Sequence, residues 1–325
     1  MEKNRKILQK SAKKTQKSAD SGKNQAKTAT KTKKTTKNPP ADAFSGFWRI
    51  PGELVALPVP DRPHPRWIDG FHRPYPGADA LLVFVHGMGS DFYRSPLKKA
   101  FLQYARLSRL SILSVNNRGA GRGTEDEPFR ACLPDLDAVL AFARASGYRT
   151  TVFLGHSTGC QKIAFWHSVR HSPDVAGLVL LAPADDNAIL RRDLGRRFDA
   201  KVAWARAAVA AGRGDRRFTP GYETFTAARF LSLADPRRDE AAMFRYAGPL
   251  TRFRRLRCPI LAVFGEEEEF APVPPAGMLA ILRRRTRSRD FDDWLVPGAG
   301  HSFAGCEPEL ARAVCAWARK TADAH

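Results

Sequence analysis

Ser157 stands in the stretch of this chain whose residue types and spacing could do chemistry. The residues before it, 151–154, are apolar or β-branched, as in a strand that is covered on both faces. Residues 155–159 read G-H-S-T-G, and the glycines of a G-x-S-x-G pattern relieve the clashes of a sharp turn from strand to helix. The helix-like run that follows would point its free N–H groups at the serine. We therefore predict a nucleophilic serine rather than a chance match in a surface turn.

A serine hydroxyl is a weak nucleophile until a base removes its proton, so a histidine must lie beside it in the fold. His301 follows the last predicted strand, in the glycine-rich stretch P-G-A-G-H-S-F at residues 297–303. A base belongs there if the chain order is serine, acid, histidine. The histidines between residues 64 and 171 do not follow that strand. We therefore predict His301 as the general base.

An acidic side chain must orient that histidine. It is expected after the strand predicted at residues 258–265, where four glutamates stand in a row at 266–269. The spacing between the glycine that ends this strand and the next proline selects Glu268, and Glu269 is the alternative. The first two glutamates of the row are expected to point to solvent. Asp185 is a third candidate, because it follows the preceding predicted strand and could reach the histidine from there.

The oxyanion that forms during serine catalysis needs two N–H donors. One is expected to be the backbone N–H of Thr158, directly after the nucleophile. The other is expected from the loop after the strand predicted at residues 80–85, where Gly87 and Gly89 let the main chain approach closely. We predict the N–H of Met88 as this second donor. The alternative for this loop is a plain glycine-rich turn.

Strand-like and helix-like runs alternate along most of the chain, which predicts an α/β fold with a mostly parallel central sheet and helices on both faces. Two proline-rich strands are expected at an antiparallel edge. An arginine-rich, largely helical segment at residues 185–257 is expected as a cap inserted between two strands. The edge strands are predicted at residues 53–59 and 66–71, and the other strands at 80–85, 110–115, 151–154, 177–183, 258–265 and 292–296. In such sheets, sites form at the carboxyl ends of the strands.

The order of these motifs resembles the α/β-hydrolase superfamily over roughly residues 50–320. The resemblance rests on His86-Gly87, the pentapeptide, the acidic loop after Gly265, and Gly300-His301. A narrower resemblance is to the uncharacterised hydrolase family that includes fungal esterases of fusarinine-type siderophores. It rests on residues 154–161, 181–186, 228–233 and 243–244. In the acidic loop, this chain has glutamate where the superfamily usually has aspartate.

The resemblance implies an α/β-hydrolase fold with a helical cap and no cofactor. It also implies hydrolysis of a small-molecule carboxylic ester, such as a siderophore-type ester, through an acyl-enzyme. A different interpretation is a catalytically silent member of the fold that binds a ligand or serves as a scaffold. The complete set of serine, histidine and acid favours the enzyme.

The formal net charge of +21 is spread unevenly along the chain. Residues 1–40 hold twelve lysines and one arginine against two acidic residues, a net charge of +11, with almost no large apolar side chains. Such a segment buries too little surface to offset chain entropy, so we expect a disordered tail. One hydrolase domain is expected at residues 41–325. The tail could contact a polyanion weakly or serve only as a solubilising extension.

The sequence shows no apolar signal segment and no stretch of about twenty apolar residues, so we expect a cytoplasmic protein without a membrane span. Five cysteines, at residues 132, 160, 258, 306 and 315, form no close pairs. This spacing argues against a disulfide framework and against a metal site. Nothing in the sequence indicates an oligomeric state.

Arginines are concentrated in the predicted cap, at residues 191, 192, 196, 197, 216, 217, 237 and 238. They could form a cationic lid that recruits an anionic substrate. They could equally form a solvated helical face that has no contact with the substrate. The two interpretations predict opposite positions for these side chains, either at the site or away from it.

Overall fold

A computed structural model describes residues 49–60, 66–220 and 223–325. The predicted tail, residues 1–40, lies outside these ranges, so its disorder and its contact with a polyanion stay predictions. Residues 52–325 form one unit, and every feature discussed below lies within it. None of the helices in the described ranges combines the length and the apolar content that crossing a bilayer requires.

Eight strands form one sheet in the order β1-β2-β4-β3-β5-β6-β9-β10. Strand β2 runs antiparallel to both β1 and β4, and the remaining neighbours are parallel. The strands are β1 Glu53–Val59, β2 Arg66–Arg73, β3 Ala80–Val85, β4 Ser111–Val115, β5 Thr150–His156, β6 Val175–Leu181, β9 Ile260–Gly265 and β10 Phe291–Val296. Strands β3, β6 and β9 are buried along their whole length. Their continuous apolar sequences follow from cover on both faces.

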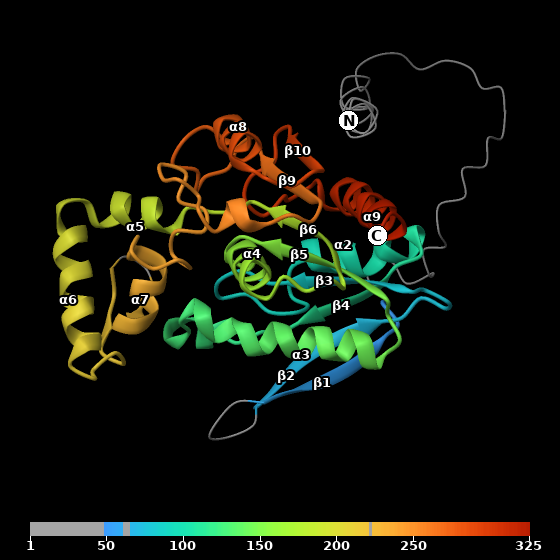
Figure 1. Cartoon of the computed structure of the whole chain (residues 1–325), viewed down its shortest axis with the longest axis horizontal. Helices are drawn as coiled ribbons and strands as arrows, with labels where there is room; N and C mark the ends of the chain where they lie inside the picture. Colours follow the sequence, from blue (N-terminus) through green and yellow to red (C-terminus); the bar gives the residue numbers. More distant parts are fainter. Residues whose placement is uncertain (1–48, 61–65, 221–222) are drawn as a thin grey trace, which may run out of the picture. The chain divides into compact units, whose positions relative to one another are not determined.

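Helices cover both faces of the sheet, with α2 and α9 on one side and α3 and α4 on the other (Figure 1). The helices are α2 Pro96–Tyr104, α3 Cys132–Ala145, α4 Thr158–Arg170, α8 Pro275–Arg285 and α9 Glu307–Asp323. Helix α9 shows why such segments fold onto a sheet. Its residues Leu310, Val314, Trp317 and Thr321 are buried and recur every three or four positions, on one face of the helix.

The segment between β6 and β9 forms the predicted cap. Its helices are α5 Asp186–Leu194, α6 Phe198–Ala210 and α7 Ala227–Ala234, which lie together at one end of the molecule (Figure 1). A small antiparallel pair, β7 Arg217–Phe218 and β8 Phe225–Thr226, joins α6 to α7. Short 3-10 helices lie at Ala105–Ser108, Gly121–Asp126, Phe129–Ala131, Gly195–Arg197 and Phe253–Arg255. The predicted architecture is thus confirmed, although the sequence analysis did not foresee the small strand pair.

The cap has an apolar core of its own and is tied to the sheet domain by ion pairs. Phe198, Phe225 and Phe230 pack together in that core with Phe129, which precedes α3. Arg217 of the cap binds the carboxylate of Asp126 at 2.7 Å and also that of Glu125. In the other direction, the Arg130 guanidinium donates to Glu240 of the cap at 3.0 Å. These contacts hold the cap over the carboxyl ends of the central strands.

Candidate active site

Ser157 lies at the turn between β5 and α4 with a φ of 55° and a ψ of −126°. A positive φ is costly for a residue with a Cβ, so this is strained backbone of the kind found at functional turns. The flanking glycines explain how the turn fits. A Cβ on Gly155 would lie 2.5 Å from the Cys160 nitrogen, and a Cβ on Gly159 would lie 2.3 Å from the Val85 carbonyl oxygen. A larger residue at position 155 would clash with the first turn of α4, and one at position 159 would clash with the end of β3.

The loop after β3 passes directly against the serine. A Cβ on Gly87 would lie 2.9 Å from the Ser157 Cβ, so glycine is needed for this approach. Met88 and Thr158 both line the same cavity as Ser157. Thr158 is the first residue of α4, and the first N–H groups of a helix have no partner within it. The two residues predicted as oxyanion donors therefore line the cavity beside the serine.

His301 lies in the loop after β10, and its imidazole contacts the acidic loop after β9. Its Nδ1 lies 2.8 Å from the Glu268 Oε1, whose side chain is 2% exposed. An ionised carboxylate only accepts hydrogen bonds, so Nδ1 carries the hydrogen and Nε2 is left to act as a base. Glu268 Oε1 also accepts the Phe270 backbone N–H at 3.1 Å, and the Phe270 ring packs edge-on against the imidazole. The carboxylate and the ring thereby fix the orientation of His301.

The backbone of the loop after β10, here called the histidine loop, is held in place by hydrogen bonds, as is the imidazole ring. The His301 N–H donates to the Glu269 Oε2 at 2.8 Å. The Gly298 N–H donates to the Glu266 Oε2 at 3.1 Å, so Glu266 is exposed but has a partner, in contrast to the expectation that it only faces solvent. His156 Nε2 lies 2.9 Å from the His301 carbonyl oxygen. Burial lowers the pKa of His156 to about 3, so its ring is neutral and donates this bond.

The third acid candidate, Asp185, lies elsewhere in the hydrogen-bond network. Its Oδ1 accepts the Ala188 N–H at 2.9 Å and caps helix α5. Its Oδ2 accepts the Tyr246 N–H at 3.0 Å. Both carboxylate oxygens therefore hold backbone of the cap, and the structure brings Glu268, not Asp185, to the His301 ring.

A cavity of about 220 Å³ opens beside the serine. Ser157, Thr158, Met88 and His301 line it on the sheet side, and the rest of the wall is largely apolar and comes mainly from the cap. The structure thus brings the predicted nucleophile, the predicted base and both predicted oxyanion residues to one cavity. In the described ranges, no group of three His, Cys, Asp or Glu side chains is arranged to bind a metal ion.

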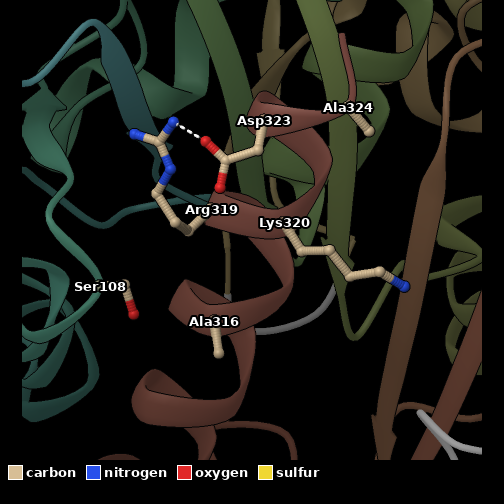
Figure 2. Close-up of a pocket in the computed structure, with 6 residues that line it drawn as sticks. All are labelled: Ser108, Ala316, Arg319, Lys320, Asp323 and Ala324. Atoms are coloured by element: carbon tan, nitrogen blue, oxygen red, sulfur yellow. Dashed lines mark hydrogen bonds and ion pairs between the residues drawn. The ribbon is translucent and has the colours of Figure 1, made fainter.

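A second hollow, on helix α9, offers no comparable chemistry (Figure 2). Its wall includes Ser108, Arg319, Lys320 and Asp323. The Arg319 guanidinium and the Asp323 carboxylate bind each other across one turn of the helix. No histidine lines this hollow to serve as a base for Ser108. The candidate active site is therefore the cavity beside Ser157.

Comparison with known families shows which family this chain belongs to. A model of the α/β-hydrolase family matches residues 82–313, which is more than two thirds of the chain. The chain belongs to the α/β-hydrolase family. The matched range begins within β3 and ends within α9, so it contains the serine turn, the acidic loop and the histidine loop. A search of curated proteins finds no match.

Solved structures similar to this α/β-hydrolase share its fold at low sequence identity. Siderophore hydrolase EstB from Aspergillus fumigatus is 19% identical with a TM-score of 0.61, covering 84% of this chain and 98% of that one. Est1E from Butyrivibrio proteoclasticus is 15% identical with a TM-score of 0.61, covering 82% and 98%. A thermostable carboxyl esterase from Bacillus coagulans is 12% identical with a TM-score of 0.64, covering 83% and 98%. Identities this low establish a shared fold and no more.

The cap arginines of this α/β-hydrolase do not line the cavity. Of the eight cap arginines that the sequence analysis names, five bind carboxylates instead. Arg191 binds Asp199, Arg192 binds Asp193, Arg217 binds Glu125 and Asp126, Arg237 binds Asp235, and Arg238 binds Glu240. The cavity wall itself contains three carboxylates, those of Asp186, Asp193 and Glu223. The interpretation of the arginines as a cationic lid over the site therefore has no support in this arrangement.

Glu269 offers a test of how much the backbone of the histidine loop matters to this α/β-hydrolase. We expect Glu269→Ala to lower kcat for an ester by about tenfold to a hundredfold, because small displacements of a catalytic group have effects of that size. Glu269→Gln keeps an oxygen that can accept the His301 N–H, so it should restore most of the activity. Steady-state kinetics of both variants check this. If Glu269→Ala and Glu269→Gln behave alike, the contact has no role in positioning.

Proposed function

We propose that this protein hydrolyses carboxylic esters of small molecules, with Ser157 as nucleophile, His301 as general base and Glu268 as the acid that orients it. One observation carries the proposal. Glu268 Oε1 lies 2.8 Å from His301 Nδ1, and His301 lines the same cavity as Ser157. The names of structural neighbours, which include a carboxyl esterase and a siderophore hydrolase, support an ester as the bond that is cleaved. A siderophore-type ester is one candidate within that class.

The first half of the proposed reaction forms an acyl-enzyme. His301 Nε2 takes the hydroxyl proton while Ser157 Oγ attacks the carbonyl carbon of the ester. The carbonyl oxygen becomes an oxyanion, and the backbone N–H groups of Thr158 and Met88 stabilise it together with the positive end of α4. The protonated imidazole, stabilised by Glu268, then gives its proton to the alcohol as the bond between carbon and alcohol oxygen breaks.

The second half returns the enzyme to its starting state. A water molecule takes the place of the alcohol, and His301 Nε2 removes one of its protons as its oxygen attacks the acyl carbon. The same two N–H donors stabilise the second oxyanion. When this intermediate collapses, Ser157 recovers its proton from the imidazole and the carboxylic acid leaves. No cofactor takes part in either step.

Covalent labelling tests this proposal directly. We expect a fluorophosphonate probe to modify the folded protein at Ser157 and nowhere else, because only a serine with an adjacent base and an oxyanion site reacts quickly with such a probe. Mass spectrometry of the peptide that contains residues 155–159 identifies the modified residue. Denatured protein is the matched control and should stay unlabelled. A folded protein that the probe does not modify would instead support a silent ligand-binding member of the family.

A further inference from the structure

The cavity beside Ser157 has an unusual charge for a protein with so many basic residues. Apart from His301, no basic side chain of the described residues lines it, whereas Asp186, Asp193 and Glu223 do. Asp193 binds Arg192 at 3.1 Å, so its charge is offset at the surface. Asp186 and Glu223 have no ion-pair partner among the described residues. These two carboxylates therefore decide the charge of the cavity.

Asp186 is held in place by a neutral group rather than by a cation. The Gln161 side-chain amide donates to its Oδ2 at 2.6 Å. Burial raises the pKa of Asp186 to about 7, opposed by the positive charges of Arg229 and of protonated His301 and reinforced by Asp185 and Glu223. Burial also raises the pKa of Glu223, and the Arg229 charge again acts in the opposite direction. Both carboxylates would be stabilised by one more positive charge beside them.

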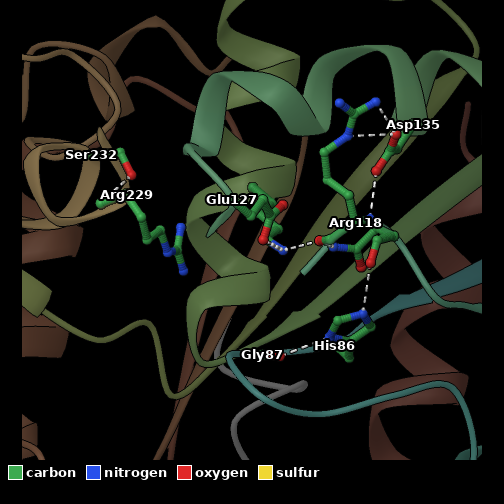
Figure 3. A network of polar contacts seen from close by, with 9 residues as sticks. His86, Gly87, Arg118, Glu127, Asp135, Arg229 and Ser232 are labelled. Carbon is green, nitrogen blue, oxygen red and sulfur yellow. Dashed lines mark hydrogen bonds and ion pairs between the residues drawn. The ribbon is translucent and has the colours of Figure 1, made fainter. Parts of the chain in front are cut away.

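Arg229 acts on both carboxylates but binds neither of them directly. Its guanidinium is completely buried, stacks on the Phe129 ring at 4.4 Å and does not line the cavity. None of its three nitrogens has a hydrogen-bond partner, and no dashed contact reaches the guanidinium in Figure 3. Its charge also acts on Glu127, but that carboxylate is already bound to Lys162 at 2.9 Å. The charge of one guanidinium is thus shared by two cavity carboxylates, and an ammonium group that binds beside them would favour their ionised forms.

The remaining wall is suited to an alkylated cation. Met88, Ile189 and Leu190 are apolar, and the rings of Phe225 and Phe270 also line the cavity. Aromatic faces attract ammonium groups, most strongly where water is excluded. In addition, Thr158 lines the cavity and is 1% exposed, and its hydroxyl oxygen has no hydrogen-bond partner among the described residues. The cavity therefore offers apolar surface, aromatic rings and polar oxygens together.

We propose that this cavity selects esters that carry an ammonium group, and that Asp186 and Glu223 are the residues that recognise it. This inference rests on the proposed esterase function, because it concerns the substrate of the same site. It also opposes the interpretation of the cap arginines as a cationic lid for an anionic substrate, since none of them lines the cavity and two carboxylates without an ion-pair partner among the described residues do. An ester that ends in a carboxylate should be rejected by the same charge.

Substrates of matched shape test the inference. We would measure kcat/KM for p-nitrophenyl esters whose acyl chain, of constant length, ends in trimethylammonium, in its uncharged isostere tert-butyl, or in carboxylate. Butyrylcholine and its tert-butyl isostere differ in the same way, trimethylammonium against tert-butyl, but in the alcohol part of the ester. In at least one series we expect the ammonium ester to exceed the tert-butyl ester by about tenfold or more, and the carboxylate ester to fall below it by a similar factor.

Variants connect that preference to the two carboxylates. Asp186→Asn and Glu223→Gln should each lower the ratio of ammonium to tert-butyl turnover by about threefold to tenfold. Asp199→Asn is the matched control, because Asp199 is an exposed cap residue that binds Arg191 and does not line the cavity. It should keep the wild-type ratio. The ratio is measured within one protein sample, so partial unfolding of a variant does not change it.

The possible outcomes separate this inference from the function on which it rests. Good turnover of the tert-butyl esters with a ratio near one in both series overturns the inference and leaves the esterase proposal intact. A preference for the carboxylate ester also overturns it. A wild-type preference for ammonium that survives in both Asp186→Asn and Glu223→Gln would show that other groups make the selection. No turnover of any ester, with no fluorophosphonate labelling, contradicts the esterase function itself.

Discussion

Replacing Ser157 with alanine should abolish ester hydrolysis, with a loss of roughly 10⁶-fold in kcat. The hydroxyl is the only group removed, and no hydrogen bond among the described residues depends on it. Alanine keeps the Cβ that packs against the loop after β3, and it adopts the φ of 55° at a cost similar to that of serine. The variant should therefore fold normally. Initial rates with an uncharged p-nitrophenyl ester, together with the melting temperature, measure both halves of this expectation.

Ser302 provides a control in the same part of the molecule. It is exposed and follows the proposed base directly, so Ser302→Ala tests whether any lost hydroxyl near the site is harmful. We expect turnover within about twofold of wild type, as for most surface substitutions. A folded Ser157→Ala protein that keeps its full ester turnover would rule out the proposed mechanism.

Replacing Glu268 with glutamine should also impair hydrolysis severely, with a loss of about 10²–10⁴ in kcat. Glutamine has almost the same shape, but it lacks the charge that stabilises the imidazolium form of His301. Its amide can also turn its N–H group toward Nδ1, which would favour the wrong tautomer of the ring. Because Glu268 is 2% exposed, water cannot replace the carboxylate. The decrease should appear in kcat rather than in KM.

Two matched variants separate this role from a general effect of charge. Glu267 belongs to the same row of glutamates but is exposed, so Glu267→Gln should be near wild type. Asp185→Asn should lower the melting temperature, because Asp185 caps α5 and binds the Tyr246 N–H, while the remaining folded enzyme keeps its chemistry. If Asp185→Asn removes activity from folded protein and Glu268→Gln does not, the acid has been assigned to the wrong residue.

The serine turn could be predicted from sequence because its determinants are local. Gly155, Ser157 and Gly159 lie within five residues, and the clashes that forbid a larger side chain at Gly155 come from the same turn, whereas those at Gly159 come from β3 and the residue after it. The alternation of apolar runs and helices likewise depends on neighbours in the chain, and it located the eight strands of the main sheet along the sequence. His301 could be located because its position after the last strand follows from that order.

The charge of the cavity could not be predicted in this way. The sequence shows sixteen arginines between residues 185 and 257, but not which of them bind carboxylates, some of which are far away in the chain. Arg217 and Asp126, for example, are 91 residues apart and meet only because the cap folds over the sheet. The same holds for His156, whose contact with the carbonyl oxygen of His301 spans 145 residues. Such contacts depend on tertiary packing, and no local pattern reports them.

The row of glutamates between Gly265 and Phe270 has a consequence for the gene. Glu266, Glu268 and Glu269 each hold a different part of the histidine loop. Slippage during replication that removes any one of the four codons yields the same protein, with three glutamates in the row. We expect that the shorter loop cannot make all three contacts at once, so His301 would lose part of its support. A sequence alignment would still show the serine, the histidine and a row of acidic residues. An inactive variant would therefore be mistaken for an active one.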